Sequence, residues 1–476
     1  MSAVLGRRRS DHGAGAVRNG GVSFWYASTA LPGRRPPLQG DRTADVCIVG
    51  GGFTGLWTAY YLKRDRPDLD VAIVEREFSG YGASGRNGGW LSSSFNGSRA
   101  AMARRHGPEA VVALSRAMQE TVDEVLSVCG AEGIEADQLK RGMLVVARNP
   151  AQQARLEAGL PEERRWLPDP EGDLVALDAA EVRGRVRVEG ARGGAWTPHA
   201  ARVQPAKLVQ DLAAAVERLG VTIHEGTAAT AAEPGVVRTQ RGTVRARHVL
   251  VCLEGFTAGL AGMRRTWLPL NSAMIATEPL DETAWAALGW DGAEVLGDGA
   301  HAYMYAQRTA DGRIALGGRG VPYRFGSRTD RDGRTQDATI AQLVGILRDM
   351  FGAPVRDARI DHAWCGVLGV PRDWSPTVTH EATTGFGMAG GYVGNGVATT
   401  NLAGRTLRDL VLGQDTPRTR LPWVGKDARR WEPEPLRFVG SRLVYGLYRA
   451  ADRREMETGR PESSRLARVA ALIAGR

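Results

Sequence analysis

The sequence predicts an α/β protein that combines a parallel sheet with a second, mostly antiparallel sheet. The first observation is an apolar run over 45–49, followed by three glycines, a helical pattern over 53–64 and a second apolar run over 71–75. Strand, glycine turn, helix and strand in this order form a βαβ unit, whose strands are parallel. The second observation is that residues 266–320 alternate apolar and polar side chains between turns, as antiparallel strands do.

The other elements are predicted from hydrophobic periodicity along the chain. Helical patterns occupy 108–129, 203–220, 339–351 and 402–412, apolar strands occupy 143–147, 221–223 and 248–253, and a hairpin is expected over 236–244. Residues 1–40, rich in Gly, Arg and Pro, are expected to form a flexible basic arm. Residues 416–476 are expected to form a basic helical tail, with amphipathic stretches over 436–451 and 464–474.

The net charge comes from the two ends of the chain. The 476 residues carry a formal charge of +9, of which 1–40 contributes +5 and 416–476 contributes +7, so that 41–415 carries −3. A slightly acidic body argues against nucleic-acid binding. A protein that binds nucleic acid or an anionic membrane through its basic ends remains an alternative. Helices packed on the body, or on a second copy of the chain, are the favoured role for the tail.

The cysteines indicate a reducing compartment. They stand at positions 47, 129, 252 and 365, with no spacing typical of a metal site or a disulfide framework, so no metal is expected and a cytoplasmic location is favoured. Nearly all of the basic residues are arginine, which indicates a GC-rich bacterial genome. The sequence contains no run of 18 apolar residues, and the arginines at 7–9 precede no apolar segment, so neither a membrane span nor a secretion signal is predicted.

Gly50, Gly52 and Gly55 form the G-x-G-x-x-G pattern of dinucleotide-binding folds. A second match, over 385–390, has no apolar strand before it, whereas the first follows a buried strand and opens a helix. The three glycines permit a tight turn, close approach of a pyrophosphate, and packing of the helix on the sheet. The start of the helix offers free N–H groups to phosphates, and Glu75 would accept hydrogen bonds from ribose hydroxyls.

The fingerprint fits both NAD and FAD, and an NAD-linked dehydrogenase remains an alternative on this pattern alone. The next segment, Gly-Ala-Ser-Gly-Arg-Asn-Gly-Gly over 82–89, favours FAD. An NAD domain would continue here into a helix and another parallel strand. A loop of small residues instead suits close passage along a long flat cofactor, with Arg86 and Asn87 contacting its phosphates and its ring edge.

Motifs spread over 23–415 carry a resemblance to a known family. They are S-F-W-Y at 23–26, the fingerprint over 44–56, the loop over 82–89, V-Q-P-A-K-L at 203–208, G-V-T-I-H-E at 220–225, D-G-R-I at 311–314, G-G-R at 317–319, H-A-W-C-G at 362–366 and G-G-Y-V-G-N-G-V-A at 390–398. In this order they resemble the FAD-dependent oxidoreductases of the D-amino acid oxidase, glycine oxidase and sarcosine oxidase superfamily. The resemblance is strongest to the branch of gamma-glutamylputrescine oxidase.

The resemblance implies a discontinuous, Rossmann-like FAD-binding domain over 41–110, 196–264 and 360–415, and a substrate domain with a mostly antiparallel sheet over 111–195 and 265–359. It assigns FAD contacts to Gly50, Gly52, Phe53, Thr54, Gly55, Glu75, Arg76, Ser84, Arg86, Asn87, Gly88, Gly89, Trp90, Leu91, Glu254, Gly255, Gly391, Gly394, Asn395, Gly396, Val397 and Ala398. The candidates for the substrate pocket are Tyr303, Tyr305, Arg319 and Trp364. No residue is singled out as catalytic, and His301 is expected to be a packed or surface histidine.

The implied activity is oxidation of the C–N bond of an amine or amino acid, by hydride transfer to flavin N5. The resulting imine hydrolyses to an aldehyde or oxo acid, and the electrons pass to O2 or to another acceptor. Several oxidases of this superfamily use a lysine near the flavin to promote reaction with O2. No lysine occurs between Lys207 and Lys426, so a dehydrogenase is favoured over an oxidase.

Three further positions depart from the family pattern or bear on the flavin link. Asn395 stands where many relatives have a histidine at the flavin edge, and Glu254 stands where relatives usually have Asn or a small residue near the adenine half. Cys365 stands where some relatives attach the flavin covalently, although noncovalent binding of FAD is favoured here.

Overall fold

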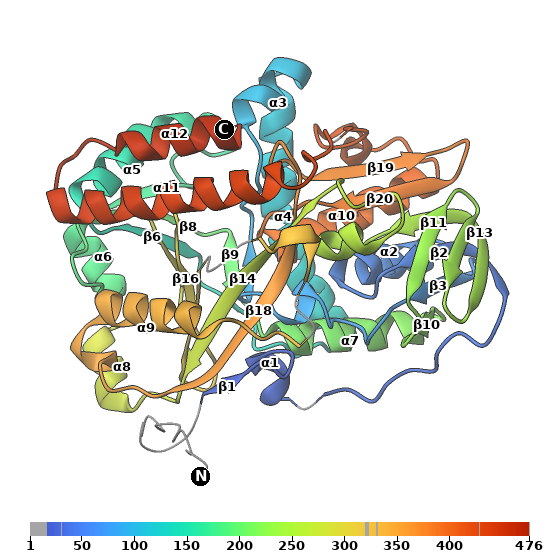
Figure 1. The fold of residues 1–476 in the computed structure, drawn as a ribbon, viewed down its shortest axis with the longest axis horizontal. Helices are drawn as coiled ribbons and strands as arrows, with labels where there is room; N and C mark the ends of the chain where they lie inside the picture. The colour runs from blue at the N-terminus through green and yellow to red at the C-terminus, as the bar shows by residue number, and fades with distance from the viewer. Residues whose placement is uncertain (1–16, 30, 319–322, 330–331, 428, 476) are drawn as a thin grey trace, which may run out of the picture.

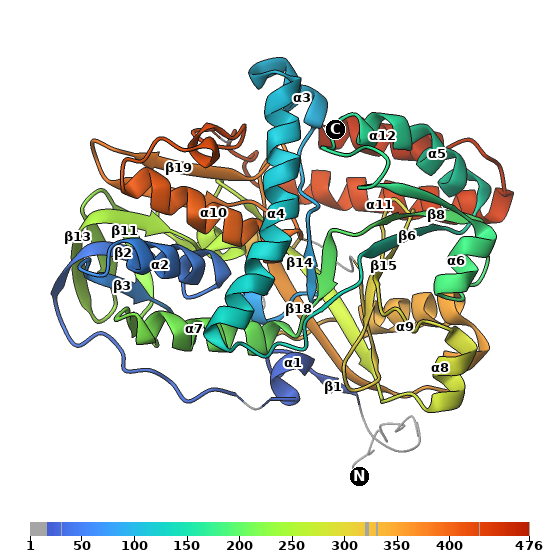
Figure 2. The ribbon, with the colours of Figure 1, turned by 180° about the vertical axis from the view of Figure 1, so that it is seen from behind.

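The computed structural model describes residues 17–29, 31–318, 323–329, 332–427 and 429–475. Two sheets lie side by side, each with its own helices, and the long strands β14 (Leu268–Thr277) and β18 (Ile360–Val370) cross the middle of the molecule (Figure 1). The reverse view shows helix α4 (Pro108–Glu132) running along the boundary between the two halves (Figure 2). The predicted α/β class with a second, mostly antiparallel sheet is confirmed.

The smaller sheet contains the predicted βαβ unit. Its parallel strands, in spatial order, are β10 (Thr222–His224), β3 (Val71–Val74), β2 (Arg42–Val49), β13 (Gly242–Val251) and β20 (Phe386–Gly390). Antiparallel β12 (Val236–Thr239), β11 (Ala229–Glu233) and β19 (Thr377–Glu381) extend it. Alternate residues of a strand point to opposite faces. Val46 and Ile48 therefore pack beneath helices, while Cys47 and Val49 belong to a second buried cluster on the other face.

The helices of the smaller sheet lie on one face and share one core. They are α2 (Phe53–Asp65), α7 (Pro205–Arg218), α10 (Gly396–Val411) and α4. Two boundaries differ from the sequence patterns. The hairpin over 236–244 and the strand over 248–253 share one continuous strand, β13, because its apolar residues remain buried beyond the turn. Helix α10 begins at Gly396, six residues before the predicted start. The prediction followed the spacing of apolar side chains, and the first turn contains too few of them to show that spacing.

The larger sheet has nine strands. Their spatial order is β1 (Arg18–Asn19), β18, β14, β17 (Ile314–Gly318), β16 (Tyr305–Arg308), β15 (Val295–Asp298), β6 (Met143–Ala147), β8 (Gly193–Thr197) and β7 (Val175–Asp178). Neighbours are antiparallel except for β1 with β18 and β15 with β6. Helices α8 (Glu282–Leu288) and α9 (Asp337–Phe351) cover one of its faces through a common apolar cluster. A small third sheet joins β4 (Trp90–Ser92), β9 (Ala200–Arg202) and β5 (Leu139–Lys140).

Two segments belong to other sheets or cores than the chain division implied by the resemblance suggests, and that division stays a prediction. Strand β18 pairs with β14 in the larger sheet, although 360–370 was assigned to the FAD-binding domain. Helix α4 packs its buried face into the core of the smaller sheet, although most of it was assigned to the substrate domain. Both strand pairing and helix docking depend on partners distant in the chain, which local patterns do not specify.

The prediction of a flexible arm over 1–40 is wrong for its described second part. Strand β1 pairs with β18, and helix α1 (Phe24–Ala27) buries three consecutive aromatic side chains against the larger sheet. The hydroxyl of Ser23 donates to the carbonyl of Gly85 at 2.8 Å, and the indole of Trp25 donates to the carbonyl of Asn87 at 2.8 Å. The segment therefore supports the loop over 82–89. Residues 1–16 lie outside the described part of the chain.

The C-terminal tail forms two helices, as predicted. Helix α11 (Leu436–Thr458) and helix α12 (Arg465–Ala474) pack on each other through Val444, Ala470 and Ala474. The remaining helices are α3 (Arg99–His106), α5 (Pro150–Arg164) and α6 (Ala179–Arg185). Among the described residues, no helix combines the length and the apolar character needed to cross a membrane.

Replacing Trp25 tests whether the N-terminal segment is part of the fold. Because Trp25 is fully buried, Trp25→Ala should lower the free energy of unfolding by about 3–5 kcal/mol, measured by urea titration. Leu31→Ala, at an exposed position of the same segment, should change it by less than about 0.5 kcal/mol. Equal, small effects of the two substitutions would show that the segment is detached.

Candidate active site

A long cavity opens at the carboxyl ends of the parallel strands β2, β3 and β13, where open α/β sheets bind ligands. It contains about 1200 Å³ of empty space, part of it open to solvent. Twelve of the residues predicted to contact the cofactor line it: Gly50, Gly52, Phe53, Thr54, Glu75, Arg76, Ser84, Asn87, Glu254, Gly394, Gly396 and Val397. The structure thus brings the fingerprint, the loop over 82–89 and the second glycine-rich segment to one place.

Close backbone approach shapes the floor of this cavity. Gly50 has a φ of +113°, and a Cβ atom there would lie 2.7 Å from the carbonyl oxygen of Cys252. A Cβ atom at Gly55 would overlap the carbonyl oxygen of Gly50, so the first turn of α2 packs directly on the strand end. Both positions require glycine, because no side chain fits between the two backbones.

The first turn of α2 lines the cavity through Phe53 and Thr54. The N–H of Phe53 donates to the hydroxyl of Ser84 at 2.8 Å, and that hydroxyl comes from the loop over 82–89. The carboxylate of Glu75 accepts the N–H of Gly51 at 2.8 Å and that of Glu77 at 2.9 Å. Burial raises the pKa of Glu75 above its ordinary value, while these two donors lower it. Unused lone pairs of the carboxylate remain for a hydroxyl donor.

The side chains of Arg86 and Asn87 hold the backbone of the loop over 82–89 in place. The guanidinium of Arg86 is buried, stacks on the ring of Tyr81 and donates to the carbonyls of Tyr81 and Cys365 at 2.7 and 3.4 Å. The amide of Asn87 donates to the carbonyls of Ala83 and Ser84 and accepts the N–H of Gly89. Two nitrogens of Arg86 thus bind backbone carbonyls, Arg86 lines the short cavity described below, and its contact with a cofactor phosphate stays a prediction.

Glu254 joins three backbone segments at the wall of the long cavity. Its carboxylate accepts the N–H groups of Gly369 at 3.2 Å, Gly391 at 2.7 Å and Tyr392 at 3.2 Å. Its own φ is +46°, in the left-handed region that non-glycine residues seldom adopt. Burial raises the pKa of Glu254 from 4.5 to about 7, and the three N–H donors oppose that rise. A carboxylate thus replaces the small residue of the family pattern as a brace between β18 and the glycine-rich segment.

A second, short cavity continues from the long one. It holds about 710 Å³ of empty space and shares Ala83, Asn87, Leu368, Gly394 and Val397 with the long cavity. Its remaining lining residues are Arg86, Gly88, Trp90, Ser272, Tyr303, Tyr305, Gly366 and Asn395. The short cavity thus lies where the loop over 82–89, the larger sheet and the glycine-rich segment meet.

Tyr305 forms the best-defined wall of the short cavity. Its hydroxyl lies 2.7 Å from that of Ser272, and its ring meets Trp90 edge-on at 6.0 Å between centroids. A Cβ atom at Gly88 would lie 2.8 Å from the Tyr305 ring, and one at Gly317 would overlap the ring. These two glycines therefore make room for an aromatic side chain that lies flat between the loop and the sheet.

Two of the four predicted pocket residues line the short cavity, namely Tyr303 and Tyr305. Trp364 does not, because it is fully buried among Phe24 and Trp25 and donates its indole N–H to the carbonyl of Arg86 at 2.9 Å. The prediction of Trp364 as a pocket residue is therefore corrected to a packing role. Arg319 lies outside the described residues.

Cys365 is on the face of the larger sheet that packs on its helices. Its thiol donates to the carbonyl of Arg334 at 3.3 Å, and its side chain belongs to the apolar cluster beneath α9. It lines neither the long nor the short cavity. Neighbouring residues of a strand face opposite sides, so Gly366 reaches the short cavity while Cys365 does not.

Six predicted contact residues line neither cavity: Gly55, Gly89, Leu91, Gly255, Gly391 and Ala398. Leu91 and Ala398 are buried in the apolar core of the smaller sheet, and Gly391 donates to Glu254. Gly255 lies against Val367 and Leu368, where a Cβ atom would come within 3.0 Å. These residues do not face either cavity, but they pack against the residues that form the cavity walls.

Sequence reasoning missed several lining residues. Tyr392 is buried in the wall of the long cavity, with its hydroxyl 3.0 Å from that of Thr54, and burial raises its pKa well above the ordinary value. Its place within the motif over 390–398 was the signal that could have found it. Ser272 and Leu368 had no such signal, because only the register of β14 and β18 brings them to the cavity.

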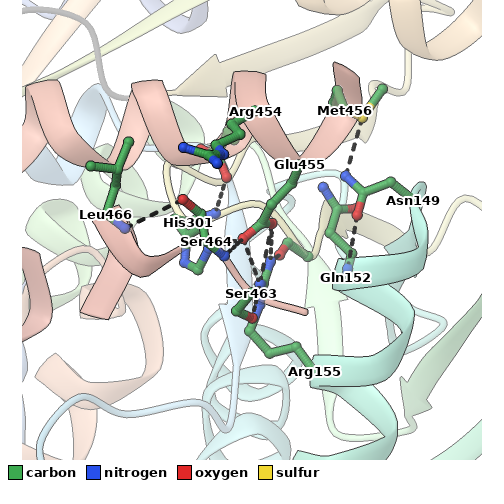
Figure 3. Close-up of polar contacts among 12 residues, drawn as sticks. Asn149, Gln152, Arg155, His301, Arg454, Glu455, Met456, Ser463, Ser464 and Leu466 are labelled. Carbon is green, nitrogen blue, oxygen red and sulfur yellow. Dashed lines mark hydrogen bonds and ion pairs between the residues drawn. The ribbon is translucent and has the colours of Figure 1, made fainter. Parts of the chain in front are cut away.

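The loop between β15 and β16, which carries Tyr303, is held by the C-terminal tail (Figure 3). Asp452 on α11 accepts the N–H of His301 at 2.8 Å and that of Ala302 at 2.9 Å. Nε2 of His301 lies 2.9 Å from Oε1 of Glu455, and the His301 ring stacks on Tyr448. His301 is thus a packed histidine, as expected.

Glu455 is the centre of this contact. Its side chain is almost fully buried, accepts the N–H of Ser464 at 2.8 Å and pairs with the guanidinium of Arg155 from α5 at 3.3 Å. Arg155 also donates to the carbonyl of Gly299 at 2.8 Å. These groups lower the pKa of Glu455 against the effect of burial, so the carboxylate is held ionised. The tail is therefore fixed on the body through buried polar contacts.

Comparison with known proteins decides the family. A family model described as FAD dependent oxidoreductase matches residues 45–410. The chain belongs to this family. The predictions of an oxidoreductase and of FAD as its cofactor are thereby confirmed, and the NAD-linked alternative is set aside.

This FAD-dependent oxidoreductase is similar in sequence and in fold to several named proteins. It is 29% identical over 396 residues to the gamma-glutamylputrescine oxidoreductase of Escherichia coli (strain K12), a match that covers 82% of this chain and 89% of that protein. Among solved structures it resembles glycine oxidase from Geobacillus kaustophilus, with a TM-score of 0.66 at 20% identity over 79% of this chain and 96% of that one. It also resembles L-proline dehydrogenase from P. horikoshii, with a TM-score of 0.66 at 16% identity over 80% and 98%.

The long cavity fits FAD by its own chemistry. The backbone at Gly50 and Gly52 is bare of side chains, and the start of α2 with the hydroxyl of Ser84 offers the donors that a pyrophosphate needs. Glu75 would accept ribose hydroxyls, and Arg76 stacked on Phe256 would border the adenine. The segment over 394–397 would face the flavin, since it lines both cavities.

A methyl group at Gly55 should disrupt the cofactor site. Because its Cβ atom would overlap the backbone oxygen of Gly50, Gly55→Ala should lower the free energy of unfolding by at least about 2 kcal/mol and reduce bound flavin, read from visible absorbance. Gly130→Ala, at an open position within helix α4, should keep the flavin and stabilise the protein by about 0.5–1 kcal/mol. Normal flavin content in Gly55→Ala would contradict this packing.

Glu254 should make stability depend on pH. Its folded-state pKa of about 7 exceeds the ordinary 4.5, so the folded protein holds this proton to a higher pH than the unfolded chain does. Stability should therefore fall as pH rises from about 4.5 to about 7, by roughly 3 kcal/mol from this group. Unfolding titrations of wild type and Glu254→Gln across that range should show the variant gaining relative to wild type. A difference independent of pH would mean that Glu254 does not titrate there.

Proposed function

We propose that this flavoenzyme oxidises the C–N bond of an amine or amino acid bound in the short cavity. The observation that supports the proposal most directly is the junction of the two cavities, where the segment over 394–397 and the loop over 82–89 face Tyr303 and Tyr305. The names of the relatives point the same way, since they include a gamma-glutamylputrescine oxidoreductase and a glycine oxidase. Glycine-like amino acids, polyamines, and N-methyl or gamma-glutamyl amines all remain candidates.

FAD, when bound, accepts a hydride from the carbon beside the amine nitrogen, which converts C–N to C=N. The chain's own part is to position the substrate. Trp90 and Tyr305 supply flat apolar walls that favour a neutral amine over a hydrated cation, and the hydroxyls of Tyr303, Tyr305 and Ser272 supply hydrogen bonds. Water then hydrolyses the released imine to an aldehyde or oxo acid. No catalytic acid or base is proposed.

Helix α10 is proposed to stabilise negative charge at the flavin edge. Its first residues, Gly396 and Val397, line the long cavity, and a helix start carries free N–H groups and the positive end of the dipole. Asn395 occupies the N-cap position and is neutral. The helix start therefore takes over what a protonated histidine provides in relatives with a histidine at this position.

We propose a dehydrogenase in preference to an oxidase that uses O2. None of the chain's four lysines, all of them within the described part, lines the long or the short cavity. Neither cavity therefore contains the lysine that promotes reaction with O2 in several oxidases of this superfamily. An artificial acceptor should reoxidise the flavin faster than O2 does.

An amine panel tests the proposed function. Flavin-loaded protein is mixed anaerobically with glycine, sarcosine, proline, putrescine and gamma-glutamylputrescine, and the visible absorbance is followed. Bleaching by at least one of them supports the proposal, and air or an artificial acceptor is then admitted to compare the rates of reoxidation. If the whole panel leaves the flavin oxidised while dithionite bleaches it, amine oxidation is not the activity.

Tyr305 should matter for the substrate and not for the fold. Tyr305→Phe removes a hydroxyl that lines the short cavity, so kcat/KM for the amine should fall about tenfold, equivalent to about 1.4 kcal/mol. Tyr60→Phe removes a comparable hydrogen bond, from Tyr60 to Glu132, outside both cavities and should change kcat/KM less than about twofold. Equal effects of the two variants would place the substrate elsewhere.

A further inference from the structure

The two tail helices expose apolar side chains on the side turned away from the body. On α11 these are Leu436, Val439 and Leu443, and on α12 they are Val469, Leu472 and Ile473, with exposed fractions from 38% to 80%. The α11 residues follow one another at intervals of three and four, and on α12 Leu472 and Ile473 come three and four residues after Val469, so each set lies on one side of its helix. We call the two sets together the outer tail face.

A buried contact sets how the two tail helices lie against each other. Val444 of α11 packs against Ala470 and Ala474 of α12, so the first half of α11 lies beside the second half of α12. Leu443 directly precedes one of these contact residues, and Val469 and Ile473 precede the other two. Single exposed apolar side chains are common on protein surfaces, whereas several of them gathered on two packed helices indicate an interaction surface.

Arginines surround this apolar surface. Arg442, Arg453 and Arg454 of α11 and Arg465 and Arg468 of α12 are exposed. Within these two fully described helices the exposed acids are limited to Glu457, near the end of α11 remote from Leu443. Asp452 and Glu455, the other acids of α11, are engaged with the body. The outer tail face therefore has one sign of charge.

The inner contacts keep this face in place. Glu455 is held by Arg155 and Ser464, and Asp452 by the loop at His301, as Figure 3 shows for Glu455. The helices are thus docked through buried polar groups, and their outer side chains are presented outward by a rigid support. The exposure of Leu472 and Leu436 is a property of the folded tail and not of an unfolded end.

We propose that the outer tail face binds the surface of an anionic membrane. Apolar side chains flanked by arginines on a surface helix match the boundary between acyl chains and negatively charged headgroups. A two-fold contact between two copies fits less well, because it would bring Arg442 and Arg468 of both copies together, and neither of the two helices carries an exposed acid near them. The proposal does not depend on the proposed amine oxidation.

Vesicle flotation tests the proposal. Flavin-loaded protein is mixed with vesicles of phosphatidylcholine alone, or of phosphatidylcholine with phosphatidylglycerol, and the floated fraction is measured. Wild type should float at least about tenfold more with the anionic vesicles, and high salt should reduce this, because lipid charge is screened. Failure to float with anionic vesicles at low salt would overturn the proposal.

Substitutions separate the two parts of the surface. Leu472→Ser with Ile473→Ser should reduce flotation about tenfold or more, and Arg442→Gln with Arg468→Gln should reduce both flotation and its salt dependence. Leu31→Ser, at an exposed leucine elsewhere in the chain, is the matched control and should float like wild type. Flavin content and melting temperature should remain those of wild type in all variants, since every changed side chain is exposed.

Self-association is the competing outcome. Light scattering after size-exclusion chromatography gives the oligomeric state of wild type and of the Leu472→Ser, Ile473→Ser variant. A wild-type dimer that dissociates in this variant would assign the face to a contact between two copies and overturn the membrane proposal. Flotation of the variant at the wild-type level would overturn it as well.

Discussion

The site depends on how closely two strand ends approach each other. Strands β2 and β13 are parallel neighbours that end together, and the turn after β2 passes the carbonyl of Cys252 with room for glycine alone. Because Gly55 lets α2 press on the same turn, the first turn of that helix lines the long cavity. The segment that follows β13 then carries Glu254 to the cavity wall. A side chain at Gly50 or Gly55 would separate these elements and open the site.

Buried glutamates extend this arrangement by accepting hydrogen bonds from backbone N–H groups. Glu75 accepts N–H groups from the glycine turn and from its own strand end, and Glu254 accepts three from β18 and the glycine-rich segment. Glu225, almost fully buried, accepts the N–H of Ser79 and pairs with Arg35 of the N-terminal segment. Since a carboxylate can accept several donors, each one fixes loops that have no regular secondary structure. The cavity walls are thus rigid although they are built from loops.

The two end segments of the chain hold loops that line the site, although they do not line it themselves. The aromatic residues of α1 lie beneath the loop over 82–89, and the tail holds the loop that carries Tyr303. These two segments contain most of the chain's excess of positive charge. Their inner faces support the site, while Arg442, Arg453, Arg454, Arg465 and Arg468 of the tail are exposed.

The sequence by itself determined the βαβ unit, the glycine fingerprint, the antiparallel character of the second sheet and the FAD-dependent family, because these depend on local patterns and on motif order. It also indicated twelve residues of the long cavity, which fall in a few short segments. It did not predict that Ser272 and Leu368 line the short cavity, that Trp364 and Cys365 are turned away from it, or that Arg86 donates to the carbonyls of Tyr81 and Cys365. Those outcomes depend on strand register and on contacts across hundreds of residues. Only the tertiary structure brings such groups within hydrogen-bond distance.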